Sequence, residues 1–243
     1  MVMKTKKLKN CFELKVNKEK PFTCQYCGHG YTKESTLITH VCEQKRRHLA
    51  ATEKHVLIGF RTFIRFFQLT QNAKQDKTYS EFAKSPYYNA FVKFGSFVSN
   101  VNPLYPDHFI DWIVKSGVKL DHWCRDALYE KYVLELIHAE HAEVALERSI
   151  KTMDTWAENN NSVWNHYFKY VSPNRATFDI KDGKISPWLI LNCQTGKDLL
   201  ASMSDEQLAS ISSIIDPQVW VKRFKNEKYN LGLVKDVVRE ASL

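Results

Sequence analysis

Three cysteines and a histidine lie close together near the start of this 243-residue chain. Cys24 and Cys27 form a Cys-x2-Cys pair, and His40 and Cys42 follow in the same short segment. Thiolate sulfur and imidazole nitrogen are common zinc ligands, and a Cys-x2-Cys pair suits a tight turn that directs two thiolates at one ion. The N-terminus lacks the apolar stretch of a secretion signal, so the cluster favours a metal over disulfides. The spacing therefore predicts a structural zinc site.

The residues leave two alternatives for the fourth ligand. On a continuous helix, positions i and i+2 lie about 200° apart, so Cys42 joins His40 only if the helix ends or unwinds at His40. His48 would need about 12 Å of helical rise to be folded back. Cys42 is therefore the preferred ligand, and His48 is the alternative.

The segment PFTCQYCGHGYTKESTLITHVC, residues 21–42, resembles a zinc finger of the two-Cys two-His type. Tyr31 and Leu37 match the small apolar core of that family. The resemblance implies a ββα fold within a basic segment, residues 1–50, that binds DNA over about three base pairs. It also implies base-reading positions in the finger helix, at Lys33, Ser35, Thr36 and Thr39. The alternative is a finger used for protein contact or for stability of the chain end.

Basic charge is concentrated in the same part of the chain. Residues 1–74 hold 15 Lys and Arg against 5 Asp and Glu, whereas the remainder holds 20 against 22. Cations that neutralise phosphates release condensed counterions, so this split indicates a nucleic-acid partner. Lys45, Arg46 and Arg47 directly follow the finger and suit phosphates better than base edges.

The rest of the chain, residues 51–243, is predicted to be one α-helical domain, which makes the fold class mainly α. Hydrophobic residues make up 44% of the chain, and only eight glycines and seven prolines are present, which disfavours a turn-rich sandwich. No window resembles a membrane span, so we expect a cytoplasmic protein without a membrane partner.

Apolar spacing places the expected elements of this domain. Val56, Phe60, Phe63 and Phe67 predict a helix with a buried stripe, and a longer helix is expected from Asp121 to about Trp156. An Asp-Gly pair, Asp182-Gly183, predicts one short β-hairpin between 177–180 and 185. Metal-like spacings occur within the long helix at Glu135, His138, Glu140, His141, Glu143 and Glu147. No second Glu-x2-His motif exists in the chain, so a solvated charged face is the preferred interpretation.

Three stretches of the body, SPYYNAFVKFG, KLDHWCRD and GKISPWLILN, resemble helical proteins that large bacteriophages encode for thymine hypermodification. The resemblance implies a transferase that joins an amine or amino acid to an activated 5-substituted pyrimidine in DNA. Such chemistry needs a base, cations for a leaving phosphate and aromatic platforms for a flipped base. The residues that the resemblance suggests for these roles are Asp121 and Asp126 as bases, Arg125 and Lys184 as phosphate holders, and Trp123 and Trp188 as platforms.

The alternative class is a non-enzymatic replication or transcription accessory, in which the finger holds DNA and the body holds replication proteins. A cleft with buried carboxylates would favour the enzyme, and an exposed aromatic patch would favour the accessory. A sequence-specific repressor is disfavoured because a lone finger with short polar side chains reads bases weakly.

Overall fold

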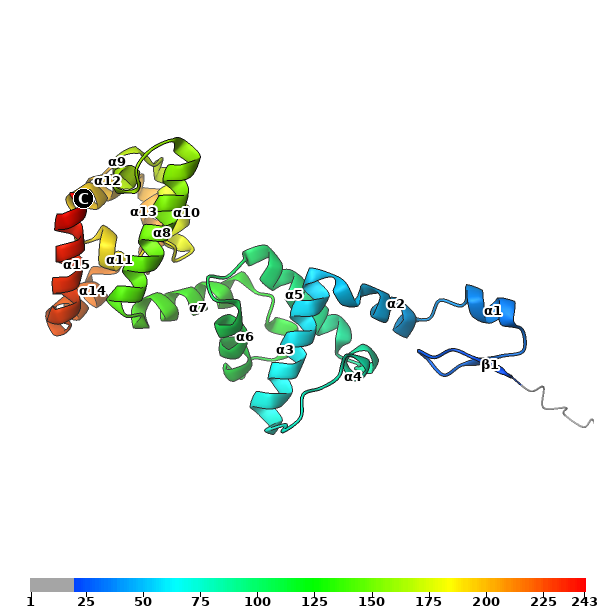
Figure 1. Ribbon diagram of the computed structural model, residues 1–243. Helices are drawn as coiled ribbons and strands as arrows, with labels where there is room; N and C mark the ends of the chain where they lie inside the picture. Colours follow the sequence, from blue (N-terminus) through cyan, green and yellow to red (C-terminus); the bar gives the residue numbers. More distant parts are fainter. Residues whose placement is uncertain (1–19) are drawn as a thin grey trace, which may run out of the picture.

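The computed structural model describes residues 20–243, which form a mainly helical molecule. A two-stranded antiparallel hairpin, β1 (Phe22–Thr23) and β2 (Gly30–Tyr31), opens the described part. Figure 1 shows the hairpin at one end of an elongated molecule and the C-terminal helices at the other. The predicted fold class, mainly α with a small N-terminal hairpin and helix, is confirmed. The predicted basic segment, 1–50, is described from residue 20 onward, and 1–19 lie outside the described residues.

Residues 20–49, which we call the metal module, have almost no hydrophobic core. The hairpin is followed by α1 (Glu34–Thr39) and α2 (Glu43–Leu49), and neither helix contains a buried residue. Cys24 is the one buried side chain of this module. A segment this small cannot be held together by apolar burial, so another source of stability is required.

The first helices of the body form an aromatic core around one close helix pair. After a short 3₁₀ turn, η1 (Ala50–Thr52), helix α3 (Lys54–Gln71) packs against α5 (Tyr88–Val101). The predicted apolar stripe of α3 faces this core, where Val56 and Phe63 are buried. Two further helices complete the group, α4 (Tyr79–Lys84) and α6 (Pro106–Lys115).

Two basic residues on the other face of α3 are occupied by ion pairs with α6. Arg61 pairs with Asp107, and Nε of Arg65 lies 2.7 Å from Oδ1 of Asp111. The Arg65–Asp111 pair is only partly buried. Arg65 nevertheless contacts both carboxylate oxygens of Asp111, and this bidentate contact fixes the position of α3 relative to α6. The Asp111 carboxyl has a lowered pKa because it accepts hydrogen bonds from Arg65.

The long helix expected from Asp121 to Trp156 is interrupted, which corrects the sequence prediction. Asp121 lies in a 3₁₀ turn, η2 (Leu120–His122), and α7 (Asp126–Ala139) ends before an extended corner at Glu140 and His141. The chain then continues as α8 (Ala142–Asn160). The corner turns the Glu140 carboxylate inward, where it pairs with Arg148 at 2.5 Å. The apolar spacing of this segment does not predict the Glu140–Arg148 pair, which accompanies the break between α7 and α8.

The β-hairpin expected around Asp182-Gly183 is also wrong, because this segment is helical. Pro173 and the capping hydroxyl of Ser172 start α10 (Pro173–Lys181). Gly183 has a φ of +72° and its N–H donates to the carbonyl of Ile180, so the Asp-Gly pair closes a helix instead of joining two strands.

The C-terminal helices surround α8, which contacts α11 and α15, while α10 contacts α13. Buried residues form one continuous hydrophobic cluster from Val56 in α3 to Val234 in α15. Among the described residues, no helix is both long enough and apolar enough to cross a bilayer. The remaining elements are η3 (Trp164–His166), α9 (Tyr167–Tyr170), α11 (Pro187–Ile190), α12 (Gln194–Ala201), α13 (Asp205–Ile211), α14 (Pro217–Asn226) and α15 (Lys228–Ala241).

Candidate metal centre

The structure brings Cys24, Cys27, His40 and Cys42 together in the metal module. Their ligand atoms all lie within 4.8 Å of one another. Sγ of Cys24 lies 4.0 Å from Sγ of Cys42, and Sγ of Cys27 lies 3.4 Å from Nε2 of His40. Bonds of about 2.3 Å to sulfur and about 2.0 Å to nitrogen place tetrahedral ligand atoms about 3.5–3.8 Å apart. This group could therefore hold a metal ion such as zinc.

A tight turn after β1 positions the first two cysteines. The N–H of Gly28 donates to the carbonyl of Cys24, and the N–H of Cys24 donates to the carbonyl of His29. Gly28 has a φ of +72°, a conformation that favours glycine. The backbone amide of Cys27 lowers the pKa of the Cys24 thiol, which favours the thiolate that binds metals.

His40 is oriented by a neighbouring tyrosine. The hydroxyl of Tyr31 lies 2.7 Å from Nδ1 of His40, while Nε2 faces the thiols. Metal-bound histidines commonly use the second ring nitrogen in this way, because the outer contact fixes the ring and its tautomer. Tyr31 was predicted only as a core residue, and the structure gives it this orienting contact as well.

Cys42 reaches the site because α1 ends at His40, as the geometry of a continuous helix requires. His40 has extended backbone angles, φ −68° and ψ 123°. Cys42 is then the N-cap of α2, where Sγ accepts a hydrogen bond of 3.3 Å from the N–H of Lys45. This cap places Sγ of Cys42 beside the other three ligand atoms.

The alternative ligand, His48, lies outside the group. Nδ1 of His48 is 2.8 Å from the carbonyl oxygen of Gln44, and its ring packs against Tyr26 and Tyr79. Among the described residues, the three cysteines and His40 form the one group of His, Cys, Asp or Glu side chains suited to a metal, so the spacings of Glu135, His138 and His141 produce no second site. Four protein ligands leave no open position, which is typical of structural sites and not of catalytic ones.

The predicted DNA-binding residues occupy different environments. Lys33, Thr36 and Thr39 are exposed along α1, and Thr39 donates back to the carbonyl of Ser35. Arg46 is exposed on α2, and Nζ of Lys45 lies 3.3 Å from the carbonyl oxygen of His40. These side chains share the surface of the metal module.

Arg47 instead points into the protein. Its side chain is only 12% exposed, and Nη1 donates to the carbonyls of Ala83 and Ser85 at 2.8 and 3.2 Å. The guanidinium also lies over the ring of Tyr88 and pairs with Glu43. In this arrangement Arg47 docks the metal module on the body, a role that sequence reasoning missed.

The residues suggested for catalysis do not converge. Asp121 and Arg125 are exposed, and Nη2 of Arg125 lies 2.7 Å from Nδ1 of His122. Asp126 lines a separate shallow cavity of about 270 Å³ with Tyr129 and other residues. Asp121 belongs to the 3₁₀ turn η2, whereas Asp126 is the first residue of α7, so the two carboxylates do not share a helix.

The two suggested aromatic platforms are core residues, which corrects the expectation for them. Trp123 is 1% exposed and donates from Nε1 to the carbonyl of Val118, and Trp188 is 0% exposed. Their ring faces are covered by Phe94, Phe224 and other side chains, so neither can stack on a base.

Lys184 lines a cleft of about 630 Å³. Sequence reasoning missed its companions Arg148, Lys151 and Arg175. Polar residues recur at i, i+3 and i+4 along α8, and this repeat could have indicated that one face of the helix lines a cleft. The preferred interpretation of the charged residues in this region was instead a solvated face. Glu140 departs from that interpretation, since it is buried against Arg148.

Comparison of the chain with protein-family models, with curated proteins and with solved structures found no match for any part of it.

Proposed function

We propose that this protein binds DNA through its metal module, in which Cys24, Cys27, His40 and Cys42 hold one structural zinc ion. The observation that carries the proposal is that three cysteine sulfurs and one histidine nitrogen lie within 4.8 Å of one another in a segment that has almost no hydrophobic core. Zinc would fold the module and keep its basic surface in place. The helical body would then act as a DNA-tethered accessory, with replication proteins as the predicted partner class.

The charge distribution supports DNA as the partner. The excess of basic residues lies in the part of the chain that contains the module, and Lys33 and Arg46 are exposed there. A single module with short polar side chains on α1 offers little for base recognition. We therefore propose binding that depends on phosphates and varies little with sequence.

A salt titration tests this function. The double variant Lys45→Gln/Arg46→Gln removes two positive charges and keeps all four proposed zinc ligands. It also removes the contact of Lys45 Nζ with the His40 carbonyl, so the zinc content of the variant is measured beside its DNA binding. The slope of log K against log salt is negative, and each lost phosphate contact reduces its magnitude by about 0.9. We therefore expect the slope of the double variant to be less steep by about 1.8 for duplexes of any sequence. Fluorescence anisotropy of labelled duplexes at several salt concentrations measures the slope.

The matched control is Lys222→Gln/Lys225→Gln, a pair on α14 at the opposite end of the molecule. It should leave the slope unchanged. Equal slopes for the wild type and the Lys45/Arg46 variant would contradict the proposal, and a change of sequence preference without general loss would mean that these residues contact bases.

A second candidate function, a protein-contact module, is supported by two apolar side chains beside the site. Ile38 and Val41 are 69% and 60% exposed. Wild-type protein that retains zinc but binds duplex and single-stranded DNA no better than the Cys24→Ser variant would favour this candidate.

The amine transferase implied by the phage resemblance takes third place. Its suggested carboxylates lie on the surface and share no cavity, and its suggested platforms are buried. Mass spectrometry of nucleosides from DNA treated with the protein and an amino-acid donor tests it directly.

A further inference from the structure

The 630 Å³ cleft lies where the first helices of the body meet the C-terminal helices. Leu104 and Tyr105 reach it from the loop between α5 and α6, while α8, Arg175 of α10 and Lys184 form the other walls. A volume of this size accommodates an organic ligand as large as a nucleotide. The cleft is independent of the metal module, which lies at the far end of the molecule (Figure 1).

One face of α8 provides most of the lining. Val144, Glu147, Arg148, Lys151, Thr152 and Thr155 recur at helical spacing along this face. The stripe extends for about 16 Å at 1.5 Å per residue. Its N-terminal end is apolar at Val144, and its C-terminal end carries Lys151 and two threonines.

Four cations and one carboxylate line the cleft. Arg148 is not available to a ligand, because Nε donates to the carbonyl of Gly183 and both Nη atoms face Glu140. Its function is to hold the turn that precedes Lys184 against α8. Thr152 adds a hydrogen bond of 3.4 Å to the carbonyl of Lys184.

The other three cations retain free donors. Lys151 is exposed and forms no ion pair with any of residues 20–243. Nζ of Lys184 has one hydrogen-bond acceptor among the described residues, Asp182 at 3.0 Å, and lies 4.5 Å from the centre of the Phe178 ring. An ammonium group carries three N–H donors, so this arrangement leaves donors unused. Arg175 uses Nε to contact Asp179 at 2.7 Å, and neither of its Nη atoms has a hydrogen-bond partner in the described part of the chain.

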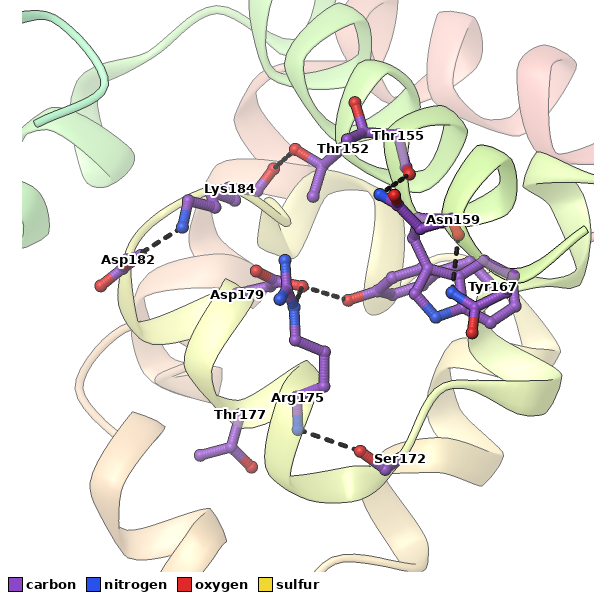
Figure 2. Close-up of polar contacts among 12 residues, drawn as sticks. Thr152, Thr155, Asn159, Tyr167, Ser172, Arg175, Thr177, Asp179, Asp182 and Lys184 are labelled. Atoms are coloured by element: carbon purple, nitrogen blue, oxygen red, sulfur yellow. Dashed lines mark hydrogen bonds and ion pairs between the residues drawn. The ribbon is translucent and has the colours of Figure 1, made fainter. Parts of the chain in front are cut away.

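Arg175 is held in place from behind. Oδ2 of the fully buried Asp179 accepts from Arg175 and also from the hydroxyl of Tyr167 at 2.9 Å. Figure 2 shows the guanidinium between Lys184 on one side and Tyr167 on the other, with Thr152 and Thr155 of α8 nearby. A buried carboxylate that fixes Nε leaves the two Nη atoms directed outward in a preset geometry, which lowers the entropic cost of binding an anion.

We propose that this cleft binds a phosphate monoester with an apolar or aromatic substituent, of about the size of a nucleoside monophosphate. Lys151, Arg175 and Lys184 come from three segments and can each address a phosphoryl oxygen, whereas a carboxylate offers only two oxygens. The substituent lies toward Leu104, Tyr105 and Val144. A free nucleotide and the terminal phosphate of a DNA strand both carry this chemistry.

Calorimetric titration of the full chain tests the proposal with adenosine 5′-monophosphate, adenosine and inorganic phosphate as probes. We expect the monophosphate to bind at least about tenfold more tightly than either of the other two, since each lacks half of the recognised groups. The variant Lys151→Gln should weaken monophosphate binding about tenfold, because it removes one charge-assisted contact. Lys222→Gln, an exposed lysine on α14, is the control and should have no effect.

A dinucleotide of thymidine, with and without a 5′-phosphate, distinguishes the two sources. Preference for the phosphorylated dinucleotide over the mononucleotide assigns the cleft to strand ends, and the reverse assigns it to free nucleotides. Equal binding of adenosine and its monophosphate, unchanged affinity in Lys151→Gln, or no binding of any phosphorylated probe at millimolar concentration would overturn the proposal. None of these variants changes a proposed zinc ligand, Lys45 or Arg46. A negative result for the cleft therefore leaves the DNA-binding proposal untouched, and a negative result for DNA binding leaves the cleft proposal untouched.

Discussion

The backbone of one residue, His40, decides which side chain completes the metal group. With helical angles at His40, Cys42 would lie on the opposite side of α1 from the imidazole. The observed extended angles reverse the chain, and Cys42 becomes a helix cap beside the other ligands. The spacing of His40 and Cys42 shows that both can bind one ion only if the helix ends at His40. The sequence does not predict that end, because no residue type at this position terminates a helix.

Zinc analysis of point variants checks the ligand set. The full chain should bind one equivalent, and Cys24→Ser or Cys42→Ser should weaken zinc binding by at least about 100-fold, since even loss of an outer-shell contact costs 10–100-fold. His48→Gln and Cys124→Ser, which remove side chains outside the group, should bind zinc like the wild type. Competition with a chelator measures the affinities, and tight binding by Cys42→Ser together with loss in His48→Gln would reverse the assignment.

At the scale of elements, the sequence predicted helices well where one apolar face explains the pattern, as in α3. The sequence predictions were wrong where a charged side chain is buried in the protein. Asp179 is buried within α10, and Glu140 is buried at the corner between α7 and α8, so polar residues that suggested a hairpin and a solvated face are internal. The Asp182-Gly183 pair is equally suited to a hairpin turn and a helix end. Here the Ser172 cap, Pro173 and the buried contacts of Asp179 favour the helix.

The contact between α3 and α5 depends on glycines in helix interiors. A Cβ on Gly95 would lie 2.0 Å from the carbonyl oxygen of His55, and one on Gly59 would lie 2.8 Å from that of Phe91. Backbone atoms cannot move aside as a flexible side chain can. The two helices therefore approach closely only because both positions lack a side chain.

Replacing Gly95 with alanine should destabilise the body by about 3 kcal/mol, the upper end of the typical cost of overpacking, because the new Cβ would lie 2.0 Å from a backbone oxygen. The matched control is Gly232→Ala in α15, where a Cβ meets nothing within 4 Å. Alanine there should stabilise by up to about 1 kcal/mol through helix propensity. Urea unfolding monitored by circular dichroism gives both values, and equal effects at the two positions would disprove the close contact.

At the scale of the whole molecule, the two candidate sites differed in how far the sequence could predict them. The metal ligands lie within one short segment, so their types and spacing predicted them. The cleft draws on residues from 104 to 184, and its cations become neighbours only when α8, α10 and the α5–α6 loop pack together. The polar repeat on α8 therefore predicts at most one wall of the cleft, and the residues from the other segments cannot be predicted from it.

The metal module is attached to the body through α2. Nη1 of Arg47 donates to the carbonyl of Ala83, in the last turn of α4, and to that of Ser85, which caps this helix. The hydroxyl of Tyr79 donates to the carbonyl of Arg47 at 2.5 Å. The ring of His48 packs on Tyr79 as well. These contacts fix the direction in which the exposed surface of the metal module faces relative to the body.

The docking role of Arg47 separates it from its neighbour Arg46 in a direct comparison. Arg46→Gln should lower the salt slope of DNA binding by about 0.9, as expected for one lost phosphate contact. Arg47→Gln should leave that slope and the zinc content unchanged, but it should speed amide hydrogen exchange in residues 42–49, because α2 loses its charge-assisted bonds to the body. Salt-dependent anisotropy and hydrogen exchange measured on the same two proteins give both readouts. A slope that falls equally in both variants, with unchanged exchange, would restore Arg47 to the phosphate-binding role that the sequence predicted.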